Sequence, residues 1–179
     1  SLMAPHVANS LLWKARENGI NADFALQNAG GVRITIPSGD ITIGQAYELL
    51  PFGNTMVVMK LSGKDVKDML LDAAMRAAKD GKTGAFPYCA GLKYALNLKK
   101  GTIDIQLEEN GKWVNLDENK DYKLVVNNFT ASGGDDYKIL GDSKGYRYDT
   151  GFVDAEIFMD YVKTTKNLKS PESLVKVIK

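Results

Sequence analysis

The sequence predicts an α+β fold in which mixed β-sheets pack against helices. Apolar residues recur with helical periodicity in some segments and alternate as in strands in others, and the two kinds of segment do not alternate regularly along the chain. A regular alternation would instead favour a doubly wound parallel sheet. The chain has 179 residues, of which 44% are hydrophobic and 25% charged, and it contains no repeat or linker. We therefore expect a single domain over residues 1–179.

The first third of the chain mixes helical and extended segments. Apolar residues spaced three and four apart predict the first helix, and Gly19 is its stop signal. Short apolar runs between glycine or proline turns indicate buried strands. In order, we expect a helix over 7–18, a strand over 22–26, a glycine turn over 27–33, a short helix over 44–50 and a strand over 55–61.

The clearest helix follows. Ser62 is placed to cap it, with Asp65 three residues later. Asp80 and Gly81 end it. The apolar stripe of this helix consists of Val66, Met69, Leu70, Ala73, Ala74 and Ala77.

The second half of the chain is richer in strands. Period-two alternation predicts strands over 92–98 and 103–107, and Asn110-Gly111 is a strong hairpin signal. A further apolar strand over 122–126 leads into a second glycine turn. The remaining expected elements are that turn, over 127–135, and a last helix over 154–164.

Composition excludes several classes of function. Lys and Arg number 23 and Asp and Glu 22, so the net charge of +1 gives no support for binding a nucleic acid polymer. No apolar run approaches the length of about 20 residues that spans a bilayer. The single cysteine, Cys89, excludes an internal disulfide, and the single histidine, His6, excludes a multi-histidine metal site. A site built from carboxylates alone remains possible on composition, but no further ligands are visible beside Asp135 and Asp136. We predict no metal site and no catalytic residue within this chain.

The two glycine turns are the candidate ligand sites. In the first, Gly30 and Gly31 allow a positive φ or a close backbone approach, and Asn28 and Arg33 flank them. A guanidinium suits a phosphate or carboxylate ligand. The alternative is a tight turn with a surface arginine.

The second turn joins Phe129 to Gly133, Gly134 and Asp135. A carboxylate can accept two hydrogen bonds from a vicinal diol such as that of ribose. A further loop over residues 51–54 supplies Phe52, and two loop phenylalanines can hold a planar base between them. The alternative is that both rings are unrelated packing residues and that Asp135 only serves the turn.

Six segments occur here in a fixed order: Ala22–Leu26 with Asn28–Arg33, Leu50–Asn54, Leu61–Val66, Phe86-Pro87 with Gly91–Lys93, Asn128-Phe129 with Gly133–Asp135, and Thr150–Ala155. Taken together, they resemble the C-terminal domain of the 5′-nucleotidase/UDP-sugar hydrolase family, and the last resembles its bacterial periplasmic members in particular. The resemblance covers about residues 7–162. It implies a layered α/β/β/α arrangement.

The resemblance also implies a function. Family members carry two divalent metal ions in an N-terminal metallophosphatase domain that hydrolyses phosphoesters, while the C-terminal domain binds the nucleoside. Phe52 and Phe129 would clamp the base, Asp135 would hold the ribose hydroxyls and Arg33 would contact phosphate. Asn28 and Asn54 would line the base pocket, beside the glycines of the two turns: Gly30, Gly31, Gly133 and Gly134.

Ser1 and Leu2 precede Met3, and no leader-like segment follows. We therefore expect a piece of a longer protein. The resemblance implies a periplasmic or cell-surface protein, of which this piece would bind a nucleotide or nucleoside but not hydrolyse it alone. The alternative is a ligand-binding or scaffold module that has no hydrolase domain as a partner.

Overall fold

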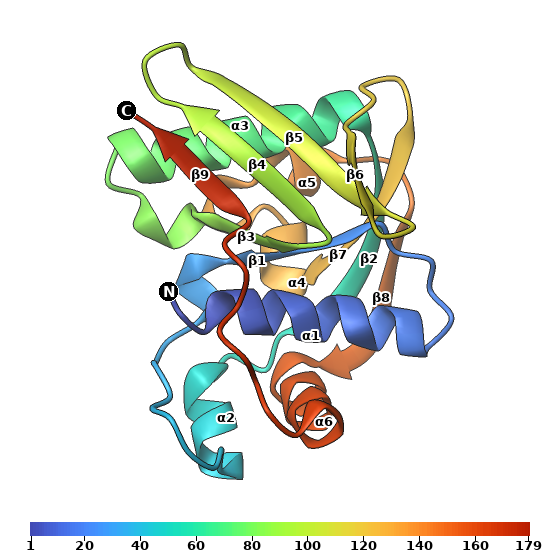
Figure 1. Cartoon of the computed structure of the whole chain (residues 1–179). Helices are drawn as coiled ribbons and strands as arrows, with labels where there is room; N and C mark the ends of the chain where they lie inside the picture. Colours follow the sequence, from blue (N-terminus) through green and yellow to red (C-terminus); the bar gives the residue numbers. More distant parts are fainter.

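Two mixed β-sheets and the helices around them make up the fold, which a computed structural model describes over all residues 1–179 (Figure 1). The helices are α1 (Ala4–Glu17), α2 (Ile43–Leu49), α3 (Gly63–Lys79), α4 (Asn128–Ala131), α5 (Lys138–Asp142) and α6 (Asp154–Thr165). The strands are β1 (Phe24–Asn28), β2 (Thr55–Ser62), β3 (Pro87–Ala90), β4 (Leu92–Asn97), β5 (Thr102–Glu109), β6 (Lys112–Asn115), β7 (Asp121–Asn127), β8 (Arg147–Val153) and β9 (Val175–Ile178). Three short 3₁₀ turns complete the list: η1 (Ala29–Gly31), η2 (Thr83–Ala85) and η3 (Gly134–Asp136).

Each sheet contains one parallel pair of strands. The five-stranded sheet has the order β3-β1-β7-β2-β8, and only β1 and β7 run parallel. The four-stranded sheet has the order β6-β5-β4-β9, and its parallel pair is β4 and β9. Strand β9 reaches that edge after the chain leaves α6 and passes in front of α1 (Figure 1). The expected α+β class with mixed sheets is confirmed.

The central strands of the five-stranded sheet are buried on both faces. In β2, Met56 and Val58 face a cluster with α1 and α6, whereas Val57 and Met59 face the larger core on the other side. That larger core combines α3 with the inward residues of β4 and β5. Because side chains alternate along a strand, β2 supplies both clusters from consecutive residues. The sheet is thus covered by α1 and α6 on one face and by α3 and the second sheet on the other.

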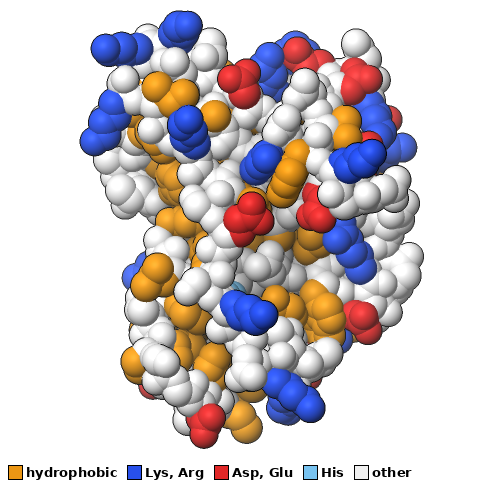
Figure 2. All heavy atoms as spheres, in the orientation of Figure 1, with side chains coloured by type: hydrophobic (Ala, Val, Ile, Leu, Met, Phe, Trp, Pro, Cys, Tyr) orange, Lys and Arg blue, Asp and Glu red, His pale blue; other side chains and the backbone are white.

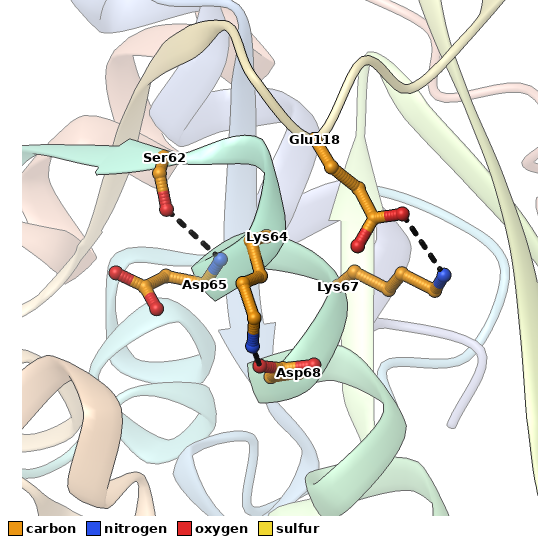
Figure 3. Close-up of polar contacts among 6 residues, drawn as sticks. All are labelled: Ser62, Lys64, Asp65, Lys67, Asp68 and Glu118. Atoms are coloured by element: carbon orange, nitrogen blue, oxygen red, sulfur yellow. Dashed lines mark hydrogen bonds and ion pairs between the residues drawn. The ribbon is translucent and has the colours of Figure 1, made fainter.

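Helix α3 begins at the predicted cap. The Asp65 backbone N–H donates to Ser62 Oγ over 3.1 Å, as Figure 3 shows. Lys64 pairs with Asp68 one turn later, and Lys67 reaches Glu118 in the segment before β7. Gly63, the first helical residue, passes directly beside the backbone of Asp117. The start of α3 is therefore held both by its own cap and by the 117–120 segment.

The face shown in Figure 2 carries charges of both signs. Basic and acidic side chains are interspersed over the upper part, and apolar side chains gather lower down. In the four-stranded sheet, Lys93 lies with its Nζ 4.5 Å from the centre of the Trp113 ring. None of the helices is both long and apolar enough to cross a membrane.

Most predicted elements are confirmed to within a few residues, but five elements were not expected: β3, α5, β8, β9 and the turn η2. The second glycine turn was described incorrectly. Asn127 accepts a hydrogen bond from the Thr130 N–H over 2.9 Å and so caps a helical turn, α4. Phe129 therefore lies on that short helix and not on a glycine loop.

Candidate functional site

All three candidate segments lie at one edge of the five-stranded sheet. Because β1 and β7 are parallel neighbours, the turns that follow them, η1 and α4, emerge side by side. Strand β2 runs antiparallel to β7, with Met56 opposite Asn127, so the loop that precedes β2 reaches the same edge. The topology thus brings together Asn28–Arg33, Pro51–Asn54 and Asn127–Asp135.

A hydrogen bond joins the side chains of Asn28 and Asp135. Asn28 Nδ2 donates to Asp135 Oδ2 over 2.6 Å, and Asn28 Oδ1 accepts from Asn127 Nδ2 over 2.9 Å. Gln27 Nε2 lies 3.2 Å from the same Oδ1. Asn28 is buried, and both polar atoms of its side-chain amide are hydrogen-bonded inside the chain, so it orients Asp135. Asp135 Oδ1 has no donor within the chain and remains able to accept a hydrogen bond from a ligand.

The glycines of the first turn are needed for close approach. Neither Gly30 nor Gly31 has a positive φ. A Cβ on Gly30 would lie 3.2 Å from Asp135 Oδ2 and 3.3 Å from the Cα of Gly84 in η2, and one on Gly31 would lie 2.6 Å from Gln27 Nε2. The three turns η1, η2 and η3 consequently pack on one another at this edge, and we call this contact the junction.

The two phenylalanines are exposed beside this junction. Phe52 is 59% and Phe129 48% exposed, and neither stacks on another aromatic ring of the chain. A Cβ on Gly134 would lie 2.5–2.6 Å from three atoms of the Phe129 ring, so that ring rests on the Gly134 backbone. Gly133 has a φ of +96° and lets the chain turn from α4 into η3.

A hydrogen bond ties the Phe52 loop to α4. The Thr55 backbone N–H donates to Asn128 Oδ1 over 3.0 Å. Arg33 is exposed, donates from Nη1 to Gly30 O over 3.2 Å and lies with Cζ 5.8 Å from the centre of the Phe52 ring. Asn54 is half-buried, and its carbonyl accepts from the Asp154 N–H over 2.8 Å.

Sequence reasoning missed three contributors to this site. Arg76 on α3 donates to the backbone carbonyls of Asp135 and Asp136. Tyr137 is buried and donates from its hydroxyl to Ala85 O over 2.6 Å, which joins η3 to η2. Gly84 completes the junction. No local pattern reveals these hydrogen bonds, because they join residues that are 52 to 60 positions apart in the chain.

Asp154 is a buried carboxylate next to the Phe52 loop. Burial raises its pKa to about 6, although Asp154 Oδ1 accepts a hydrogen bond from the Ala155 N–H. Since this pKa is higher in the folded chain than in the unfolded one, the group stabilises the fold when protonated. That contribution is lost as the pH rises from about 4 to about 6.

We therefore expect Asp154→Asn to stabilise the chain above pH 6 by about 3 kcal/mol relative to the wild type, with little difference at pH 4. Urea unfolding between pH 4 and pH 8 measures this. Asp160→Asn, an exposed position on the same helix, is the matched control and should show no such pH-dependent gain. Parallel pH profiles for the wild type and Asp154→Asn would contradict the assignment.

The remaining reactive side chains lie outside this junction. Cys89 is buried in β3, and burial raises the pKa of its thiol, so it is unreactive. His6 lies in α1, where burial lowers the pKa of its imidazole. A cavity of about 610 Å³ between Lys67, β4, β5 and residues 173–176 contains none of the candidate residues. No group of three or more His, Cys, Asp or Glu side chains in the chain could hold a metal ion.

Comparisons with known proteins all match this chain to one family. Residues 4–142 match the family described as 5′-nucleotidase, C-terminal domain. The chain is 38% identical over 179 residues to a probable 5′-nucleotidase of Treponema pallidum, covering 95% of this chain and 30% of that protein. It superposes on the 5′-nucleotidase precursor of Thermus thermophilus with a TM-score of 0.90 at 40% identity, covering 99% of this chain and 35% of that one.

A second solved structure, the NAD nucleotidase of Haemophilus influenzae, gives a TM-score of 0.87 at 35% identity and covers 99% of this chain and 33% of that one. The chain therefore spans about a third of the length of each of these three proteins. Both the sequence match and the superposition extend over the three segments that meet at the sheet edge. This chain belongs to the 5′-nucleotidase C-terminal domain family.

Proposed function

We propose that residues 1–179 form a nucleoside-binding domain of a metal-dependent 5′-nucleotidase or UDP-sugar hydrolase. One observation carries the proposal: two exposed phenylalanines, from the segments before β2 and after β7, lie at the same sheet edge as a carboxylate that has one oxygen free. Large apolar side chains at an exposed edge next to a fixed polar group are typical of a ligand site. Family membership supports the same assignment.

Each part of a nucleotide finds a group of matching chemistry. The base would lie between Phe52 and Phe129, where stacking tolerates any base. Asp135 Oδ1 would accept from a ribose hydroxyl, while Asn28 holds the other oxygen. Arg33 uses one of its donors on Gly30 O and keeps the rest for a phosphate. Asn54 would border the base, and the glycines at 30, 31, 133 and 134 would let the backbone approach the ligand.

Hydrolysis would be the task of a second domain. The family implies two divalent metal ions, but the side chains of this chain do not form a site that fits them. An N-terminal metallophosphatase domain would hold both ions, and they would supply the nucleophile and polarise the phosphate there. This chain would contribute binding and orientation. We place the whole protein in the periplasm or at the cell surface, as the family resemblance implies.

A calorimetric titration of the chain with adenosine, AMP and UDP-glucose tests the proposal. We expect saturable binding that Asp135→Asn weakens about tenfold or more, since the substitution removes the charged acceptor. Asp136→Asn is the matched control, because both positions have a positive φ that asparagine tolerates. A wild-type chain that binds none of the three ligands would favour the scaffold alternative. An Asp135→Asn variant that binds as well as the control would remove Asp135 from the binding site.

A further inference from the structure

Asp135 and Asp136 have an unusual backbone. Their φ values are +52° and +60°, so two consecutive residues other than glycine lie in the left-handed region. Each such residue costs about 1 kcal/mol or more, and the conformation persists only when the surroundings impose it. Some contact must therefore hold this segment in the shape that directs the Asp135 carboxylate.

Arg76 provides that contact. Its Nη1 donates to Asp135 O over 3.0 Å and its Nη2 donates to Asp136 O over 3.1 Å. Its Nε donates to Asp72 Oδ2 over 2.9 Å, one turn earlier on α3, and the side chain is only 18% exposed. The planar guanidinium thus spans two successive carbonyls while Asp72 fixes its orientation. A lysine could not reproduce this geometry, since an ammonium group has a single nitrogen and lacks the planar fork of donors.

Asp135 is consequently held at both ends. Arg76 fixes its backbone, and Asn28 fixes Oδ2 of its carboxylate. Tyr137, the next buried residue, anchors the end of the same turn on Ala85. Asp135 Oδ1 accepts no hydrogen bond from the chain, so the direction of that atom depends on the Arg76 contact.

We propose that Arg76 is a positioning residue for the sugar part of the nucleoside site: by bridging the carbonyls of Asp135 and Asp136, it directs Asp135 Oδ1 at the ribose hydroxyls. The inference rests on the proposed nucleoside-binding function. Arg76 lies on α3, remote in sequence from both glycine turns. It would control how well the site distinguishes a ribose from a sugar that lacks the 2′ and 3′ hydroxyls.

The test compares adenosine with 2′,3′-dideoxyadenosine, which cannot bond to Asp135, by calorimetric titration. Arg76→Lys should weaken adenosine binding about tenfold and leave dideoxyadenosine binding unchanged. The reason is that only adenosine donates to the Asp135 carboxylate, which has lost its alignment in this variant. Asp72→Asn, which keeps the guanidinium but removes its anchor, should cause the same selective loss to a smaller degree. Thermal unfolding of each variant reports whether the fold is retained.

Arg147 supplies the matched control. It donates to Ala131 O and Ser132 Oγ in the preceding part of the same segment, so Arg147→Lys should leave the ratio of the two affinities unchanged. Equal losses for both ligands in Arg76→Lys, or no loss for either, would overturn the positioning role while leaving nucleoside binding intact. A wild-type chain that binds neither ligand would overturn the proposed function, and this inference with it.

Discussion

Replacing Gly63 by alanine is expected to destabilise the chain by about 3 kcal/mol, among the largest losses for any single methyl group added here. A Cβ at this position would overlap the carbonyl oxygen of Asp117 and lie 2.9 Å from the Cα of Glu118. Both neighbours are backbone atoms, so no side-chain rotation can make room. The backbone is pinned as well, since the Gly63 N–H donates to Lys120 O over 2.7 Å and the Lys64 N–H to Glu118 O over 3.1 Å.

The loss is measured by urea unfolding followed by circular dichroism. Gly44→Ala is the matched control, because a Cβ there meets only Thr42 Oγ1 at 3.9 Å and helix α2 should gain from alanine. Gly63 does not have a positive φ, so the effect isolates the close approach of α3 to the 117–120 segment. Equal stability of the two variants would contradict the close packing of α3 against the 117–120 segment.

Removing the Phe129 ring is expected to weaken nucleoside binding by about 5- to 150-fold, which corresponds to the loss of one stacking partner of a base. The ring is half-exposed and rests on Gly134, so Phe129→Ala should change the stability of the chain little. Gly134→Ala should act in the same direction by another route. The added methyl group would overlap the ring and displace it without removing any of its atoms.

Calorimetric titration of adenosine into both variants measures the effect. Tyr148→Ala, which removes an exposed aromatic ring from β8, is the control and should bind as the wild type does. Full affinity in both Phe129→Ala and Gly134→Ala would show that the ring is a packing residue. A loss in Phe129→Ala alone would mean that the ring binds the base but adapts to the methyl group.

The sequence predicted the elements whose pattern is set by burial. Helix α3 has a continuous apolar stripe and a capping serine, and both are confirmed. The strands that were missed have no such pattern. Strand β8 forms an exposed edge, β9 is short and mostly exposed, and β3 begins at Pro87, a residue that argues against a central strand. These strands exist because a neighbouring strand offers hydrogen bonds, which a local pattern does not show.

The candidate site was also predicted only in part from the sequence. Glycines, loop aromatics and a carboxylate after buried strands marked the segments that the sheet brings to one edge. The sequence did not show that Asn28 would be buried and bonded to Asp135, since that contact joins residues 107 positions apart. It also did not distinguish Arg76 from the other charged residues on the polar side of α3. Both contacts follow from tertiary packing alone.

The parallel pairing of β1 with β7 has a consequence for how the chain folds. These strands are separated by nearly a hundred residues, so their pairing closes a long loop and carries a large entropic penalty before any contact is gained. Such non-local pairings slow folding to the range of about milliseconds to seconds. The edge where η1 meets η3 cannot exist until that step is complete. The proposed nucleoside site therefore requires the assembled sheet. It is absent from partly folded chains, even those with α3 and the β4–β5 hairpin in place.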